Sequence, residues 1–238
     1  MAGLTANGAS AIEGEDMELA GASFCADLSG ALYWSESRLL CVADLHFEKG
    51  SSFARHGRFP PPYDTRATLT RLQQVIARYN PRSVICLGDN FHDGDGPARL
   101  PGEDRHMLLA MQRGREWIWI AGNHDPDPAI GIGGQFCDQI GIGEIVFRHE
   151  PCGAGATAEI AGHLHPLARI SARGRVLSRK CFASNGRRMV MPAFGAFTGG
   201  LNIRSRAFQS VFDGEVFMAH MLGATRFYAV AAMRCLPD

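Results

Sequence analysis

The chain has 238 residues, and its 24 basic and 24 acidic side chains give a formal net charge of zero, which by itself neither indicates nor excludes a nucleic-acid partner. Hydrophobic residues make up 46% and charged residues 20%, which excludes a disordered or fibrous chain and fits one domain with a full-size core. The seven cysteines form no CxxC pair, which argues against a disulfide framework or a cysteine-based zinc site and favours a reducing cytoplasm.

The N-terminal segment, residues 1–16, is small, polar and acidic and predicts a flexible tail, so that residues 17–238 form a single domain. This tail has no basic segment ahead of an apolar run, which argues against a signal peptide. No stretch of about 18 apolar residues predicts a membrane span. We therefore expect a cytoplasmic protein without a membrane partner.

Short apolar runs and one helical pattern predict the fold class. Five runs predict strands: residues 39–43, 83–87, 116–121, 144–148 and 157–161. Residues 65–80 have apolar side chains at helical spacing, and residues 104–112 form a weaker helix candidate. Four later runs separated by turn residues predict a meander of strands: residues 189–197, 207–212, 216–222 and 226–233. This order predicts a layered α/β domain with two packed sheets and flanking helices.

Charge is distributed unevenly, because residues 160–212 contain no Asp or Glu. The same stretch holds a series of candidate phosphate-backbone contacts: Arg169, Arg173, Arg175, Arg179, Lys180, Arg187 and Arg188. Such a segment can give one basic face on a neutral protein, or it can consist of solvated arginine-rich loops. Both interpretations stay open.

Candidate metal ligands follow the five predicted strands. They are Asp44, His46, Asp89, Asn123, His149, His163 and His165. Ligand sites in open α/β sheets lie at the carboxyl ends of the strands, and residues two apart on extended chain point the same way. Each residue alone fits an ordinary turn or core position, but the ordered set does not. Nitrogen and oxygen donors without sulfur suit Mn, Fe, Zn, Co or Ni, and seven ligands fit two ions that share a carboxylate.

These ordered motifs resemble the calcineurin-like metallophosphoesterase superfamily: Asp44-Leu-His46, Gly88-Asp89, Gly122-Asn123-His124-Asp125, His149 and Gly162-His163-Leu-His165. The resemblance implies a four-layer αββα sandwich of two mixed β-sheets flanked by helices. A closer resemblance to the bacterial PdeM subfamily of ligase-associated DNA damage response endonucleases rests on residues 42–50, 61–65, 87–93, 122–126, 149–151 and 191–195. It implies DNA as substrate, work in DNA repair, and a DNA ligase and a helicase as partners.

The resemblance also implies roles for single residues. One ion is held by Asp44, His46 and His165. The second is held by Asn123, His149 and His163, and Asp89 bridges the two. His124 sits beside the ions without binding them. The mechanism we expect is attack on phosphorus by a hydroxide bridging two divalent ions, most simply Mn, with His124 as the catalytic residue that protonates the leaving oxygen or stabilises its charge.

Three neighbouring residues are candidates to support these ligands without binding the metal: His92, Asp93 and Asp125. His92 stands where the superfamily has an Asp, and Asp125 could orient His124. Two alternatives to a DNA endonuclease remain: a phosphodiesterase or phosphatase acting on nucleotides or cyclic nucleotides, and a noncatalytic metal-binding scaffold. The roles of Glu48 and Lys49 stay open.

Overall fold

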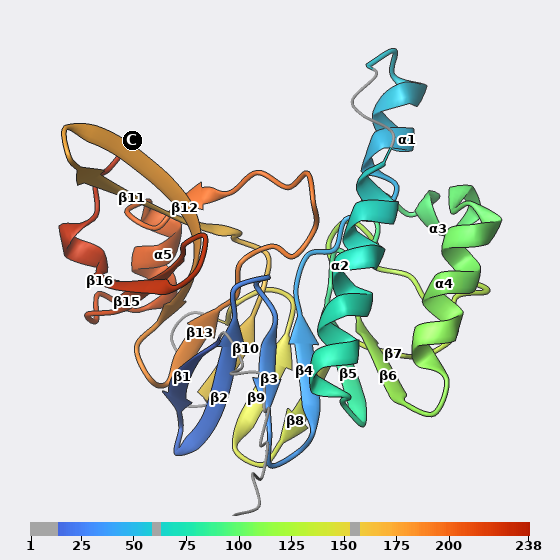
Figure 1. Cartoon of the computed structure of the whole chain (residues 1–238), viewed down its shortest axis with the longest axis horizontal. Helices are drawn as coiled ribbons and strands as arrows, with labels where there is room; N and C mark the ends of the chain where they lie inside the picture. The colour runs from blue at the N-terminus through green and yellow to red at the C-terminus, as the bar shows by residue number, and fades with distance from the viewer. Residues whose placement is uncertain (1–13, 59–62, 153–157) are drawn as a thin grey trace, which may run out of the picture.

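The computed structural model describes residues 14–58, 63–152 and 158–238, which form two stacked mixed β-sheets (Figure 1). The first sheet contains β1 (Gly14–Leu19), β2 (Ala22–Asp27), β3 (Leu32–Trp34), β4 (Leu39–Val42), β5 (Ser83–Leu87), β6 (Glu116–Ile120) and β7 (Gln135–Cys137). The second contains β8 (Gln139–Ile142), β9 (Ile145–Arg148), β10 (Ala158–Ala161), β11 (Pro166–Ala172), β12 (Arg175–Ser184), β13 (Arg188–Val190), β14 (Leu201–Asn202), β15 (Met218–Leu222) and β16 (Phe227–Ala231). The helices are α1 (Lys49–Arg55), α2 (Asp64–Tyr79), α3 (Gly96–Arg99), α4 (Gly102–Gln112), α5 (Arg206–Val211) and the 3₁₀ turn η1 (Ala232–Arg234).

Strand order differs between the two sheets. In the described chain the first sheet runs β1-β2-β3-β4-β5-β6-β7, antiparallel up to β4 and parallel from β4 to β7. The second runs β14-β11-β12-β13-β10-β9-β8, with β15 paired to β12 and β16 paired to β15. Its β9, β10 and β13 are mutually parallel. Parallel strands of both sheets therefore bring their carboxyl ends to a common edge.

Side-chain alternation along these strands creates four layers. Leu40 and Val42 of β4 pack against α2 and α4, whereas Leu39 and Cys41 face the second sheet. A strand buried on both faces is expected to be apolar throughout, which explains why β4 reads as an unbroken apolar run. Figure 1 shows α2 and α4 covering the outer face of the first sheet.

The outer face of the second sheet forms a third core. Cys181 and Ala183 of β12 point toward α5, and Phe182 between them points into the core between the sheets. The layers are therefore helices, sheet, sheet and helix, which confirms the αββα sandwich expected from the resemblance. Every helix within the described ranges is too short or too polar to cross a bilayer.

Most predicted elements are confirmed, with boundaries shifted by one or two residues. Residues 65–80 correspond to α2, and residues 83–87 coincide with β5. Residue 157 of the predicted strand 157–161, and residues 61 and 62 of the segment 61–65, lie outside the described residues. Strand β1 begins at Gly14, so the first sheet extends three residues into the expected tail.

One predicted strand is wrong, because residues 207–212 belong to helix α5 (Arg206–Val211) and its C-cap. Phe208, Val211 and Phe212 are spaced for one helical face, and all three are buried in the third core. Phe212 stacks on Phe217 with ring centroids 4.1 Å apart. A short apolar run does not distinguish a strand from a buried helix by periodicity. Only the start of the predicted strand 189–197 is confirmed, because β13 ends at Val190.

Candidate metal centre

The first group of candidate ligands joins the ends of β4, β5 and β10. The Nε2 atoms of His46 and His165 are 3.3 Å apart. His165 Nε2 lies 3.3 Å from Asp44 Oδ1, and His46 Nε2 lies 3.7 Å from Asp89 Oδ2. One donor atom from each of these four residues lies within 4.8 Å of the others. They could hold one metal ion.

The second group lies on the other side of Asp89. Asp89 Oδ1 is 3.3 Å from His149 Nε2, and His163 Nδ1 is 3.2 Å from the same nitrogen. The side-chain oxygen of Asn123 lies 2.9 Å from His149 Nε2 and 3.0 Å from His163 Nδ1. The two groups thus meet at Asp89, whose two carboxylate oxygens face different groups.

A left-handed backbone turns most of these side chains toward the centre. Five of the seven candidate ligands have φ between 45° and 69°: Asp44, His46, Asp89, His163 and His165. Non-glycine residues with positive φ are uncommon, and such strain concentrates at functional sites. The expectation that the two pairs lie on extended chain is therefore wrong, although both pairs do reach the centre. A sequence gives no direct signal of this conformation at Asp or His.

Glycines give the ligands room. A Cβ at Gly122 would lie 2.0 Å from the backbone nitrogen of Asp89, and one at Gly88 would lie 2.5 Å from the ring of His149. Gly88 also has φ +74°, which side chains rarely adopt. Glycine at these places lets one segment approach the ligand of another.

The electrostatics of the centre fit a cation. Asp44 is 0% exposed and Asp89 3%, and neither forms a salt bridge with a Lys or Arg of the described residues. Burial, followed by the neighbouring histidines, lowers the pKa of His46 to about 2, so this imidazole is neutral. Two buried carboxylates without a positive partner are costly, and divalent ions would compensate them.

The hydrogen bond of His149 supports the same conclusion. Its Nδ1 lies 2.9 Å from the carbonyl oxygen of Leu87 and donates to it, because that oxygen can only accept. In the neutral ring, Nε2 then carries a lone pair, which points at the oxygens of Asn123 and Asp89. Such a backbone-oriented imidazole is the usual arrangement of a metal-binding histidine.

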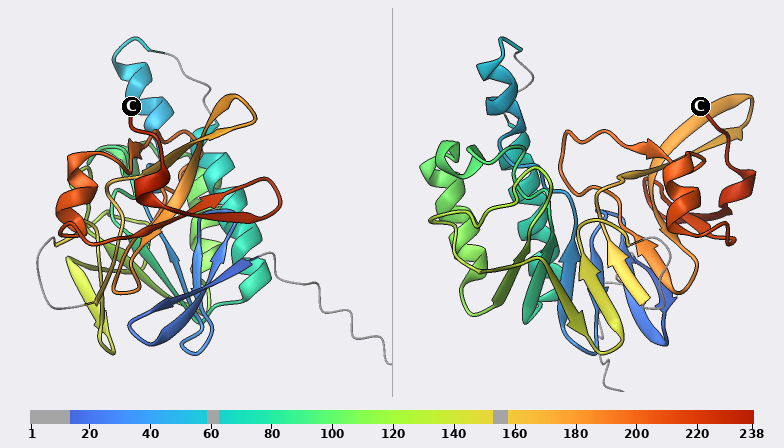
Figure 2. Two further views of the ribbon diagram at one scale, coloured as in Figure 1. Left: turned by 90° about the vertical axis from the view of Figure 1, so that its left-hand side faces the viewer. Right: turned by 180° about the vertical axis from the view of Figure 1, so that it is seen from behind.

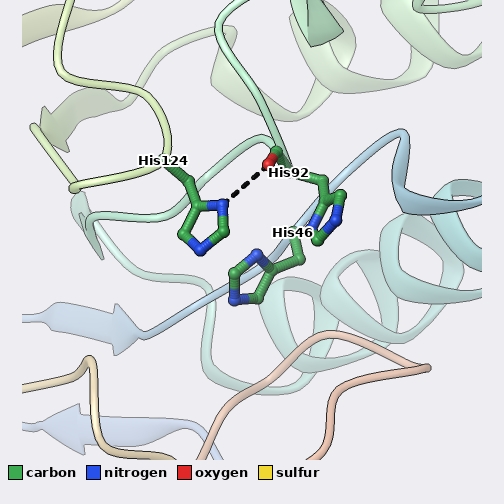
Figure 3. A group of neighbouring side chains, drawn as sticks. All are labelled: His46, His92 and His124. Carbon is green, nitrogen blue, oxygen red and sulfur yellow. Dashed lines mark hydrogen bonds between the residues drawn. The ribbon is translucent and has the colours of Figure 1, made fainter. Parts of the chain in front are cut away.

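His124 is not a member of the four-residue group, but it lies next to His46 and His92, and these three histidines form a further group whose donor atoms lie within 4.8 Å of one another (Figure 3). Its Nδ1 donates to the carbonyl oxygen of His92 at 2.8 Å, and its backbone N–H donates to Asp89 Oδ1 at 3.0 Å. The rings of His124 and His92 stack, with centroids 5.3 Å apart. These contacts hold Nε2 of His124 toward the centre, 4.0 Å from Asp89 Oδ2.

Comparisons with known proteins agree with this geometry. The sequence model of the calcineurin-like phosphoesterase family matches residues 37–169. The chain belongs to the calcineurin-like phosphoesterase family. It is therefore a metal-dependent phosphoesterase, a hydrolase, and the ligand groups described above occupy the expected edge of its sheets. Membership of this enzyme family argues against a noncatalytic metal-binding scaffold.

Solved structures include a similar nuclease. The crystal structure of Pseudomonas putida nuclease MPE has a TM-score of 0.72 and 26% identity, over 90% of this chain and 100% of that chain. Yfce, a phosphoesterase from E. coli, has a TM-score of 0.41 and 14% identity, over 82% of this chain and 98% of that one. No curated protein sequence matches the chain.

The hydrogen bonds that the structure gives Asp125 go to the loop after β5 and not to His124, contrary to one sequence expectation. Its Oδ2 accepts hydrogen bonds from the backbone N–H groups of Asn90 and Phe91 at 3.0 and 3.1 Å. Burial raises the pKa of Asp125 to about 6. Its carboxylate therefore fixes the loop after β5, and the carbonyl of His92 orients His124 instead.

Asp93 belongs to none of the candidate ligand groups of the described residues. Its carboxylate accepts a hydrogen bond from Arg99 at 2.8 Å and pairs with that guanidinium. Burial opposes ionisation, but bonds from Arg99 and Ser52 lower the pKa of Asp93 to about 2. This ion pair connects the loop after β5 to α3.

Lys180 and Arg188 are not surface phosphate contacts. Lys180 Nζ donates to the carbonyl oxygens of Ala193 and Gly195, at 2.7 and 3.1 Å, and to Thr198 Oγ1 at 2.8 Å. Arg188 is 6% exposed and donates to the carbonyl oxygen of Val211. Long-range partners of this kind leave no local sequence signal.

The loop that Lys180 anchors reaches the metal centre, and the sequence reasoning missed its role. The N–H of Gly195 donates to the carbonyl oxygen of Asp44, and Arg71 donates to that of Phe194. The Arg71 guanidinium also lies 4.6 Å from the centroid of the Phe194 ring. The loop therefore holds the backbone of a candidate ligand.

The remaining basic residues of the predicted phosphate track differ from one another. Arg169 pairs with Asp238 at 3.0 Å and is held at the C-terminus. Arg173, Arg175 and Arg179 are exposed on the β11–β12 hairpin. Arg187, in the turn before β13, is exposed too. The predicted track is thus reduced to its hairpin arginines and Arg187.

Proposed function

We propose that this phosphoesterase is a nuclease that cleaves phosphodiester bonds of DNA at a centre of two divalent ions bridged by Asp89. One observation carries the proposal: two ligand groups meet at the two carboxylate oxygens of a single buried Asp89. Two ions held in this way form a clamp for the attacking and leaving oxygens of a phosphoryl transfer.

The protein contributes position and charge. Asp44, His46 and His165 would hold one ion, and Asn123, His149 and His163 the other. Bound divalent ions lower the pKa of water and offset charge on the phosphoryl oxygens. The Leu87 carbonyl presents Nε2 of His149 to the centre, and the glycines before three of the motifs, Gly88, Gly122 and Gly162, allow the segments to approach one another.

His124 is the proton donor of the proposed reaction. Its Nδ1–H donates to the His92 carbonyl, so Nε2 carries the exchangeable proton at the edge of the centre when the ring is in its imidazolium form. A leaving alkoxide has a high pKa, so a proton delivered as the P–O bond breaks lowers the barrier. Nε2 is the donating atom, and the side chain is 40% exposed, open to a substrate.

A nucleic-acid substrate is supported by the similarity to the P. putida nuclease over 90% of this chain. DNA in particular, manganese as the ion, and a DNA ligase and helicase as repair partners are proposed from the sequence motifs. Nucleotides and cyclic nucleotides would suit the same centre. Activity on them without cleavage of DNA would favour the second candidate function, a nucleotide phosphodiesterase or phosphatase, over the nuclease.

The proposal is tested with protein loaded with Mn²⁺ and assayed on a single-stranded oligonucleotide, a supercoiled plasmid, a cyclic nucleotide and an aryl phosphodiester. We expect cleavage of the DNA substrates, internal cuts in the oligonucleotide, and two equivalents of bound metal per chain. Turnover of the cyclic nucleotide and aryl diester with intact DNA would overturn the nuclease. One tightly bound equivalent at full activity would overturn the two-ion centre.

A further inference from the structure

A groove opens where two hairpins of the second sheet diverge. Residues Cys181–Ser184 of β12 pair with β15, but Arg175–Lys180 continue beyond it as a ribbon with β11. The β15–β16 hairpin turns back between Leu222 and Phe227. The space between the hairpins is a cavity of about 860 Å³. Figures 1 and 2 show both hairpins on the side of the molecule opposite α3 and α4.

One face of the β11–β12 ribbon lines this groove. Arg175, Leu177 and Arg179 alternate along β12 and therefore share a face. Ile170 and Ala172 of β11 lie opposite Leu177 and Arg175 in the register and extend the same face. The groove is thus lined by regular strand geometry and not by an irregular loop.

The groove is strongly basic. Its lining includes Arg173, Arg175, Arg179 and Arg226 and contains no acidic residue. Within the described residues, none of these four arginines forms a salt bridge. Four guanidinium groups facing one cavity without acidic partners favour a polyanion, and arginine matches phosphate oxygens in geometry.

Apolar surface lies among these charges. Leu177 is 37% exposed and Tyr228 is 45% exposed. The guanidinium of Arg226 lies 4.9 Å from the centroid of the Tyr228 ring. A basic groove with an exposed aromatic ring is the combination that binds single-stranded nucleic acid, because phosphates pair with the arginines and a base stacks on the ring.

The groove is connected to the metal centre by one strand. Strand β11 begins at Pro166, directly after His165, and runs to the groove. Ile170 and Ala172 are five and seven residues beyond His165, roughly 17–23 Å at the rise of a β-strand. A nucleic-acid strand that advances about 3.4 Å per nucleotide would extend from the scissile bond to the groove within about seven nucleotides.

We propose that this groove binds the single-stranded part of the nucleic-acid substrate at a distance from the cut, an inference that rests on the proposed function. The four groove arginines contact phosphates, and Tyr228 stacks on a base. The groove then sets substrate length preference: oligonucleotides that span centre and groove bind tightly, whereas dinucleotides depend on the centre alone.

The test compares the wild type with the quadruple variant Arg173→Gln, Arg175→Gln, Arg179→Gln and Arg226→Gln. Binding of a labelled oligothymidylate long enough to span centre and groove is followed by fluorescence anisotropy in chelator at several salt concentrations. We expect the slope of log Kd against log salt to fall by about 3, at about 0.7 per phosphate contact on a single strand. Tyr228→Ala should weaken binding about tenfold.

Controls separate the groove from the centre. Arg113→Gln, at an exposed arginine after α4, should leave the salt slope unchanged. Hydrolysis of an aryl phosphodiester should stay at the wild-type rate in every variant, which also shows that the variants fold. An unchanged slope in the quadruple variant overturns the groove while DNA cleavage by the wild type keeps the proposed function. Preference of the wild type for a duplex over the single strand also overturns the single-strand assignment.

Discussion

At the residue scale, two separate contacts fix the position of His124, one through its backbone and one through its ring. The backbone N–H binds the carboxylate of Asp89, and Nδ1 binds the carbonyl of His92. Neither contact uses Nε2, which faces the centre. Both contacts leave Nε2 available for the proposed proton transfer.

His124→Ala tests this role. We expect kcat for DNA cleavage to fall by about 100-fold or more, the usual contribution of general acid catalysis. Hydrolysis of bis-p-nitrophenyl phosphate should fall much less, because nitrophenolate leaves without protonation. Metal content should stay at the wild-type value. His106→Ala, at an exposed histidine of α4, serves as the control. Equal losses on both substrates would contradict the proton-donor role.

Gly88 shows how a residue without a side chain shapes a ligand. Gly88→Ala would place a Cβ 2.5 Å from the ring of His149 and would also strain a backbone at φ +74°. We expect weaker Mn²⁺ binding, measured by isothermal titration calorimetry, and a loss of stability above the roughly 1 kcal/mol that the backbone conformation alone costs.

The matched control is Gly114→Ala, which has φ +72° and no heavy atom within 4 Å of the added Cβ. It should lose the backbone contribution alone and bind Mn²⁺ normally. Equal metal affinity in the two variants would show that the His149 ring moves without cost.

At the element scale, the loop after β13 is held to the metal centre from both sides. The backbone N–H groups of Phe194 and Gly195 donate to the carbonyl oxygens of Ala43 and Asp44. On the other side, Lys180 of β12 donates three hydrogen bonds to two carbonyl oxygens and one hydroxyl of the loop. Burial lowers the pKa of Lys180 to about 8, which is the expected effect of placing an ammonium group away from water.

Lys180→Met should release this loop. Two carbonyl oxygens and the Thr198 hydroxyl lose their donor, so we expect the free energy of unfolding to fall by about 2–3 kcal/mol in urea titrations. Protease digestion should cut the loop faster. Arg179→Met changes the neighbouring exposed residue and should be neutral within about 0.5 kcal/mol. A neutral Lys180→Met would mean that water replaces its bonds.

At the scale of the whole molecule, two packed sheets bury two carboxylates that form backbone hydrogen bonds but no ion pair with a Lys or Arg of the described residues. Asp44 and Asp89 lie at the edge where the parallel strands of both sheets end, so metal binding and stability should be coupled. The fold holds these charges in place for function at a cost in stability.

Metal removal should therefore destabilise the protein. We expect Mn²⁺ at about 100 times its Kd to raise Tm by roughly 5–10 °C relative to protein in EDTA, measured by differential scanning calorimetry. Asp89→Asn should raise Tm in EDTA, because it removes a buried charge, and should lose most of the shift with Mn²⁺. A wild-type Tm that is insensitive to EDTA would contradict this coupling.

The sequence by itself determined the order of the candidate ligands along the chain and indicated a metal centre with nitrogen and oxygen donors. Buried parallel strands are apolar on both faces, so β4, β5 and β6 stand out as apolar runs, each followed directly by polar donors. Helix α2 was equally visible, because one face packs on the sheet and the other meets water. These are local signals, and they suffice to predict a layered α/β domain with two packed sheets and the candidate ligands, whereas the four-layer sandwich was implied by the family resemblance.

The tertiary structure decided what depends on distant partners. The backbone N–H of His163 donates to Asp44, 119 residues away, and Lys180 donates to carbonyl oxygens 13 and 15 residues along the chain. Asp93 pairs with Arg99 only six residues on, but spacing alone does not reveal this contact either. Helix α5 is a helix because Phe208 fills a core built by other strands. The basic groove exists because two hairpins diverge. Charge and periodicity give residue types, but packing alone gives each residue its neighbours.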